Sequence, residues 1–174
     1  MSLSTLRCLA AYNQWADAKL LTKLSNLSSA ALIEDRQGFF GGLSGVLNHR
    51  IAADKIWHGR LMRQDVSTLQ LDTHFSHEMA EIQALMKANA SNWISYVEGL
   101  SDPLTTTRYR TMAGLEFDRP TELVLTHIFN HATHHRGQTH HMLSMAEQNP
   151  PQIDLIYFLD TWLDDVDPPE RSKP

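Results

Sequence analysis

The segment LTHIFNHATHHRGQ, residues 125–138, places His127, His131 and His135 at intervals of four. An α-helix has 3.6 residues per turn, so side chains four positions apart lie one above the other on the same face. Imidazole is the commonest metal-ligating side chain in proteins. The spacing therefore predicts a helix that presents a pair of metal-binding rings, with a third ligand supplied from elsewhere in the fold.

The helix that carries these histidines has a predicted beginning and end. Pro120 suits the first turn, where a backbone N–H is not needed, and Pro150-Pro151 stops the helix, which we expect to reach about Gln148. The histidines occupy positions that aliphatic side chains would otherwise take on the buried face. Burying an imidazole without a partner costs roughly 1–3 kcal/mol, and one metal ion would be a partner to several rings at once.

Three other segments have apolar residues at intervals of three and four, and we predict that each is a helix. These segments are residues 3–24, 44–62, with Ser44 as the predicted N-cap, and 79–100. Each has an apolar face that must be covered. Four such helices predict an all-α fold, an irregular four-helix bundle.

Two smaller elements complete the predicted fold. Residues 101–119 contain four threonines and Tyr109, which favour extended backbone, with Ala113-Gly114 as a turn, and this predicts a short β-hairpin between the third and fourth helices. A short C-terminal helix is expected from about Asp154 to Leu163. We expect one domain over residues 1–174, in which residues 166–174 form a loose tail.

Composition excludes several classes of protein. The net charge of −5 and the lack of a Lys/Arg run argue against a nucleic-acid partner. The single cysteine, Cys8, excludes an internal disulfide and a multi-cysteine zinc site. Neither a signal-peptide stretch nor an apolar segment long enough for a membrane is evident, so we expect a cytoplasmic protein without a membrane partner.

The third ligand is expected to be His49, which lies in the helix predicted over residues 44–62. Other metal chemistries fit less well, because a di-iron centre needs Glu-x-x-His pairs on two helices and neither this helix nor the histidine-rich one has such a pair. The alternative is that these histidines lie at the surface or make single hydrogen bonds. Asp54, five residues after His49, is a candidate ligand or catalytic base. The alternative for Asp54 is an ordinary carboxylate on the surface of the helix.

Three motifs carry a resemblance to a known family. They are YNQWA at residues 12–16, LNHRIAADKIW at 47–57 and the histidine-rich segment at 125–138. With them the chain resembles the DinB/YfiT-like family of metal-dependent bundles over about residues 7–160. The resemblance implies an irregular four-helix bundle, often dimeric, and one divalent ion per chain, zinc or nickel. It places the three ligands on His49, His131 and His135.

Three neutral imidazoles leave a coordination position open, as in catalytic metal sites. Several relatives resemble thiol S-transferases, which implies that the metal activates a thiol, or water, for attack on a small electrophilic substrate. The expected partners are that substrate, a low-molecular-weight thiol and a second copy of the chain. No organic cofactor is expected.

Residue roles beyond the ligands stay open at this point. Arg136 is a candidate to clamp a substrate carboxylate, or it forms an ion pair on the helix, and Gln138 is a candidate to orient a ligand ring. Two other functions remain alternatives. One is a metal-dependent hydrolase with Asp54 as its base, and the other is a non-catalytic metal-binding or stress-response protein.

Overall fold

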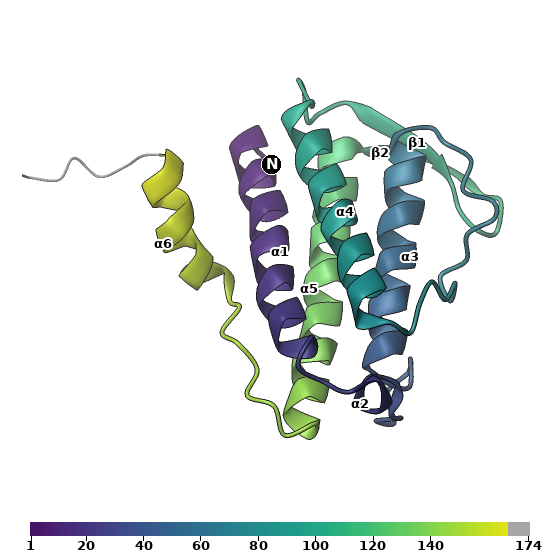
Figure 1. Ribbon diagram of the computed structural model, residues 1–174. Helices are drawn as coiled ribbons and strands as arrows, with labels where there is room; N and C mark the ends of the chain where they lie inside the picture. The colour runs from purple at the N-terminus through teal and green to yellow at the C-terminus, as the bar shows by residue number, and fades with distance from the viewer. Residues whose placement is uncertain (167–174) are drawn as a thin grey trace, which may run out of the picture.

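Four long helices dominate the computed structural model, which describes residues 1–166 (Figure 1). They are α1 (Leu3–Leu24), α3 (Leu43–Leu61), α4 (Met79–Glu98) and α5 (Thr121–Met145). Helices α1 and α3 each pack against both α4 and α5. The all-α bundle predicted from the sequence is therefore confirmed, with α1 and α3 at opposite corners.

The connection from α3 to α4 runs along the outside of α3, because these two helices point in the same direction (Figure 1). The connection comprises residues 62–78. Asn48 on α3 holds the last part of this connection in place through hydrogen bonds. The backbone N–H groups of Phe75 and Ser76 donate to Asn48 Oδ1 at 2.7 and 3.1 Å, and Asn48 Nδ2 donates to Ser76 O at 2.8 Å. A segment without regular structure is thereby held against the middle of the bundle.

Two apolar clusters fill the ends of the bundle. One gathers Leu21, Leu47 and Leu143, and the other gathers Leu6 and Leu125 with their neighbours. The buried polar residues of α1, α3 and α5 include Asn13, Asp17, His49, Arg50, His135, Arg136 and Thr139. On α1 and α5 these residues fall between the segments that build the two clusters. The core thus has a polar layer at mid-height, where functional side chains are concentrated.

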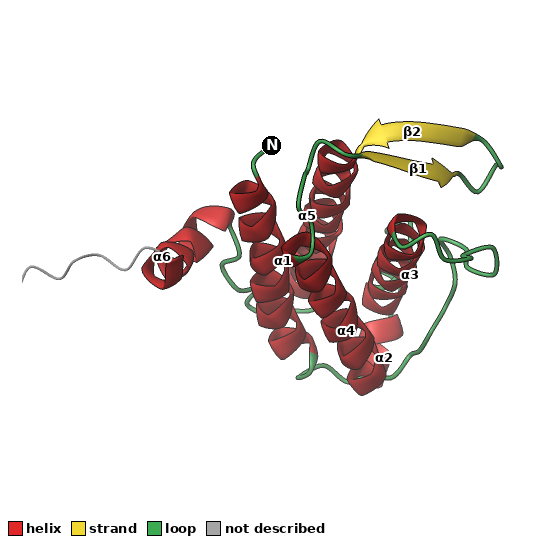
Figure 2. Ribbon diagram, turned by 90° about the horizontal axis from the view of Figure 1, so that it is seen from above, coloured by secondary structure: helices red, strands yellow, loops and turns green. Residues whose placement is uncertain are grey.

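The predicted hairpin is present and leads directly into α5 (Figure 2). Strand β1 (Thr106–Arg110) pairs antiparallel with β2 (Glu116–Pro120), and Tyr109 lies opposite Phe117. Gly114 turns the chain with φ of 81°, in the left-handed region that glycine adopts without strain. The hairpin covers one end of the bundle beside α3 and α5.

Several helix boundaries differ from the prediction, and α4 ends at Glu98, two residues before the predicted end, while the C-terminal helix reaches Val166 and not Leu163. Helix α3 begins at Leu43 with Gly42 as its N-cap, so the predicted cap Ser44 is wrong. Pro120 ends β2 and caps α5, which begins one residue later. Helix α5 ends at Met145, before the predicted Gln148, since the backbone turns into the left-handed region at Glu147 with φ of 55°.

A short helix that the sequence analysis did not predict, α2 (Ser29–Ile33), precedes α3. Five residues are too few to show a helical period. The Ser28 hydroxyl caps it by accepting from the Ala31 N–H at 3.2 Å.

The C-terminal helix α6 (Leu155–Val166) packs against α1, where Phe158 contacts Tyr12 and Trp15. Its Ile156 and Tyr157 side chains are 64% and 46% exposed. The predicted homodimer stays a prediction, and the predicted tail lies almost wholly outside the described residues. Within residues 1–166, no helix is both long and apolar enough to cross a membrane.

Candidate metal centre

Three histidines from two neighbouring helices converge at mid-height. His49 comes from α3, and His131 and His135 come from α5. One ring nitrogen of each lies within 4.8 Å of the other two. The Nε2 atoms of His131 and His135 are 3.0 Å apart, and the His49 ring centroid is 4.6 Å from that of His135. The structure thus brings together the three residues, called below the histidine trio, that the sequence analysis selected.

Hydrogen bonds orient two of the three rings. His49 Nδ1 lies 2.8 Å from Leu71 O, and His135 Nδ1 lies 2.8 Å from Gln138 Oε1. Both partners are carbonyl oxygens, which only accept, so each Nδ1 donates and each Nε2 keeps a lone pair. Bonds of this kind fix ring orientation at metal sites. Gln138 therefore has the orienting contact predicted for it, whereas the contact from Leu71 was not predicted.

The surroundings of His131 and His135 keep both imidazole rings neutral. Burial and, to a smaller extent, the neighbouring histidines together lower the pKa of His131 to about 3. Burial also lowers the pKa of His135 to about 4, although its bond to Gln138 acts in the opposite direction. A neutral imidazole is the form that binds a metal ion, because proton and metal compete for one lone pair.

The remaining histidines of α5 lie outside the trio. His127 is exposed, and its ring centroid is 5.9 Å from that of His131. His140 Nε2 lies 3.2 Å from Pro151 O in the connection to α6. His141 is exposed. His134 is exposed as well, and none of these four histidines belongs to the group of possible ligands among the described residues.

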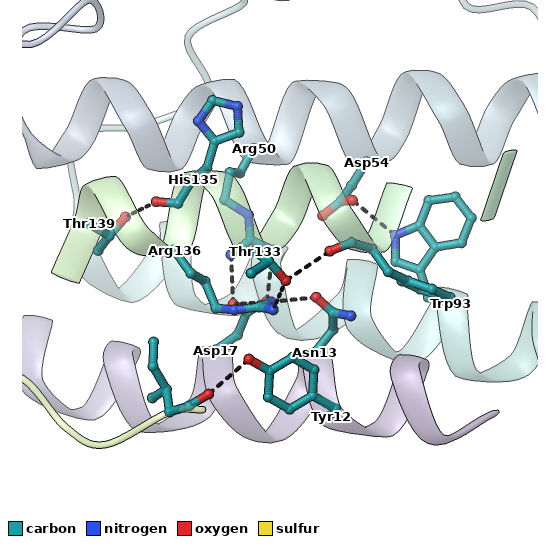
Figure 3. Close-up of polar contacts among 12 residues, drawn as sticks. Tyr12, Asn13, Asp17, Arg50, Asp54, Trp93, Thr133, His135, Arg136 and Thr139 are labelled. Carbon is teal, nitrogen blue, oxygen red and sulfur yellow. Dashed lines mark hydrogen bonds and ion pairs between the residues drawn. The ribbon is translucent and has the colours of Figure 1, made fainter. Parts of the chain in front are cut away.

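Asp54 is placed away from the histidine trio, towards α4. Trp93 Nε1 donates a hydrogen bond to Asp54 Oδ1 at 3.0 Å (Figure 3). Asp54 does not belong to the group of possible ligands found among the described residues. Burial raises the pKa of its carboxyl group to about 6, against the opposing effect of Arg50. It is therefore a partly buried carboxylate and not the surface residue considered as the alternative.

The raised pKa of Asp54 predicts a pH-dependent effect of the Asp54→Asn variant. Between the unfolded pKa, 3.8, and the folded pKa, about 6, the native state binds more protons than the unfolded state. The wild-type carboxyl group therefore destabilises the fold increasingly as pH rises through this window, and the penalty is complete above it. Relative to wild type, Asp54→Asn should gain ~1–3 kcal/mol in free energy of unfolding at about pH 7.5.

Urea unfolding of both proteins at about pH 7.5 and about pH 5 measures this difference. The advantage of the variant should shrink at the lower pH. An advantage that does not change with pH would show that the Asp54 carboxyl group titrates in its ordinary range.

Arg136 points into the bundle and not towards the trio. Its side chain is 1% exposed, and its guanidinium group donates to Asn13 Oδ1 and to Thr133 Oγ1, the latter at 2.8 Å (Figure 3). Arg136 Nη1 also lies 3.5 Å from Asp17 Oδ1. The structure thus places Arg136 in a buried ion-pair network, where its guanidinium is not accessible to a substrate carboxylate.

Asp17 on α1 is the centre of this network. Arg50 on α3 donates to both carboxylate oxygens, at 2.6 and 2.9 Å. Burial raises the pKa of Asp17, but the charges of Arg50 and Arg136 outweigh burial and hold that pKa below its ordinary value. Arg50 directly follows His49, and Arg136 directly follows His135. The carboxylate therefore joins the two helices that carry the trio, a role that the sequence analysis missed.

Comparison with known proteins agrees with this architecture. The sequence model of the DinB family matches residues 1–169. Protein DinB of Bacillus subtilis (strain 168) is 26% identical to the chain over 157 residues, which cover 85% of this chain and 90% of the relative. The similarity thus spans the bundle, the hairpin and the histidine trio.

Proposed function

The chain belongs to the DinB family, and we propose that it is an enzyme that depends on one divalent metal ion bound by His49, His131 and His135. The convergence of three ring nitrogens within 4.8 Å is the observation that carries this proposal. Zinc and nickel fit such a site, since imidazole suits both ions. Two rings already have the outer hydrogen bonds that such ligands use.

Residues around the trio would prepare the site for catalysis by orienting its rings and covering one side of them. The bonds from Leu71 O and Gln138 Oε1 aim the ring lone pairs, and the Phe40 ring stacks on His49 with centroids 4.3 Å apart. This contact covers one side of the trio with apolar surface. A bound divalent ion would supply Lewis acidity that makes a thiol or a water molecule acidic enough to act as a nucleophile near neutral pH.

A thiol is the nucleophile that we propose: it would lose its proton to solvent, and its sulfur would bond to an electrophilic carbon of a small substrate as the leaving group departs from that carbon. The alternative, a hydrolase, would use a carboxylate base beside the ion, and the group of possible ligands among residues 1–166 contains no carboxylate. Asp54, the candidate for that base, is bonded to Trp93 instead. The lack of a carboxylate base among these possible ligands favours a nucleophile that the metal ion alone makes acidic enough to lose its proton.

The test compares metal-free and metal-loaded protein purified without a polyhistidine tag. With zinc or nickel restored, the protein should accelerate the reaction of cysteine or glutathione with an electrophile such as monobromobimane, and the metal-free protein should not. Thiol-independent ester hydrolysis by the loaded protein would favour the hydrolase. Full metal occupancy without turnover in broad thiol and substrate screens would favour a non-catalytic metal-binding protein.

A further inference from the structure

We propose that a bay beside the histidine trio binds the flat apolar part of a small anionic substrate, an aromatic carboxylate being the simplest example. The bay has a volume of about 290 Å³ and is lined by Trp57, Tyr109, Arg119, Leu123, Val124 and His127. It lies where α3, the hairpin and the beginning of α5 meet. The inference rests on the proposed function, since it names the substrate class of that site.

Aromatic rings form the walls of the bay. The Trp57 ring centroid lies 5.0 Å from that of Tyr109 and 5.3 Å from that of His127, both edge to face. Leu123 is 57% exposed at the rim, and Val124 is buried below it. Large exposed apolar side chains beside an aromatic cavity are typical of ligand sites, where a planar apolar group can replace water.

The bay is contiguous with the histidine trio. Leu123, His127 and His131 are spaced by four residues on α5, so they follow one another along a single helical face. The His127 and His131 ring centroids are 5.9 Å apart. A ligand seated against Trp57 and His127 would therefore have its reactive end within one helical turn of the trio.

Arg119 supplies the charge that selects an anion. Its guanidinium group stacks on Phe117, 4.7 Å from the ring centroid, and donates to the Asp118 carbonyl oxygen. Among the described residues it forms no ion pair with a carboxylate, whereas Arg108 on the neighbouring strand is paired with Asp118. Arginine recognises carboxylates through paired N–H donors. An exposed arginine at the rim of an aromatic cavity thus matches a substrate with an aromatic and an anionic end.

Arg60 adds positive charge behind the same wall. Its guanidinium group lies 4.7 Å from the Trp57 ring centroid and 5.6 Å from that of Tyr109. Its buried Nε has no hydrogen-bond partner among the described residues. A second positive charge therefore lies on this side of the bay.

Binding of trans-cinnamate and of its uncharged analogue cinnamamide tests the bay. We expect the full-length protein to bind cinnamate more tightly than cinnamamide in calorimetric titration. Arg119→Gln should weaken cinnamate binding by about tenfold, because a hydrogen-bonded charge is lost. Leu123→Asn should weaken both ligands. The matched control is Arg108→Gln, which removes an exposed arginine from the same hairpin and should bind as wild type does.

Equal affinity of Arg119→Gln and Arg108→Gln for cinnamate would overturn the proposal, as would equal affinity of wild type for the two ligands. Nuclear relaxation of cinnamate on the Co²⁺-loaded protein tests its position. The cinnamate protons should relax faster, and this effect should disappear in His131→Ala. Binding without faster relaxation would also overturn the proposal. If the protein takes up no divalent ion, the proposed function is refuted. Comparing cinnamate binding by Arg119→Gln and Arg108→Gln in metal-free protein would still test whether the bay binds an anion.

Discussion

Replacing His49 by alanine is expected to abolish stoichiometric binding of a divalent ion. The variant removes the one member of the trio that lies on α3, so only His131 and His135 on α5 remain. Two neutral rings on one helix hold an ion far more weakly than three converging ligands. Metal analysis after exhaustive dialysis should give about one ion per wild-type chain and almost none for the variant.

Thermal unfolding gives a second measurement of the same effect. An ion that binds only the native state stabilises it by ~2.7 kcal/mol at a concentration a hundred times its Kd. Wild-type protein should therefore unfold at a higher temperature when metal is added, and His49→Ala should not. The metal-free His49→Ala variant should retain the helical circular dichroism of the wild type, since the substitution leaves the apolar clusters at both ends of the bundle unchanged.

His140→Ala is the matched control, because His140 lies on α5 but contacts Pro151 O and not the trio. It should bind metal as wild type does. Equal losses in His140→Ala and His49→Ala would indicate diffuse chelation by surface histidines. Unchanged affinity in His49→Ala would show that no ion is held between α3 and α5.

Replacing Asp17 by asparagine is expected to destabilise the fold by ~3–5 kcal/mol, since two buried guanidinium groups lose their counter-charge. Arg50 and Arg136 are 4% and 1% exposed, and both reach the Asp17 carboxylate. Urea unfolding of the metal-free protein near neutral pH measures the loss. The folded pKa of Asp17 is lowered, so its contribution is complete above the unfolded pKa, 3.8, and is lost as pH falls through the folded value.

Asp118→Asn provides the comparison for this variant. Asp118 forms an exposed pair with Arg108, and solvent screens such pairs so strongly that they contribute little to stability. A similarly small effect at Asp17 would mean that the buried arginines find other partners and that the network does not stabilise the core. The two variants make the same chemical change, so burial and the number of arginines bound account for the difference.

Much of the fold and the trio could be predicted because the signals are local. The four helices follow from apolar residues repeated every three or four positions, and the hairpin follows from threonine-rich residues around Gly114. His131 and His135 share a helical face by spacing alone. His49 was selected as the histidine of a separate amphipathic helix, the resemblance placed a ligand at the same residue, and the packing of α3 against α5 brings it to the other two.

The rest depends on contacts between distant residues. Asp17 reads as an ordinary polar residue of an amphipathic helix, and nothing local shows that Arg50, 33 positions away, binds it. The carbonyl group of Leu71 has no sequence signal at all, since every residue carries one. It lies 2.8 Å from His49 Nδ1, in a connection whose residues 75 and 76 are held against α3 by Asn48. Backbone partners and buried charges therefore had to come from the structure.

The bidentate contact between Arg50 and Asp17 has a consequence for ion selectivity. Helix α1 contributes no histidine, yet its carboxylate holds the residues adjacent to ligands on both α3 and α5. The relative position of the two helices that carry the trio therefore depends in part on a helix that contributes none of its rings. If the trio binds an ion as proposed, we expect sequence changes in α1 to alter which ionic radius fits it without altering a single ligand.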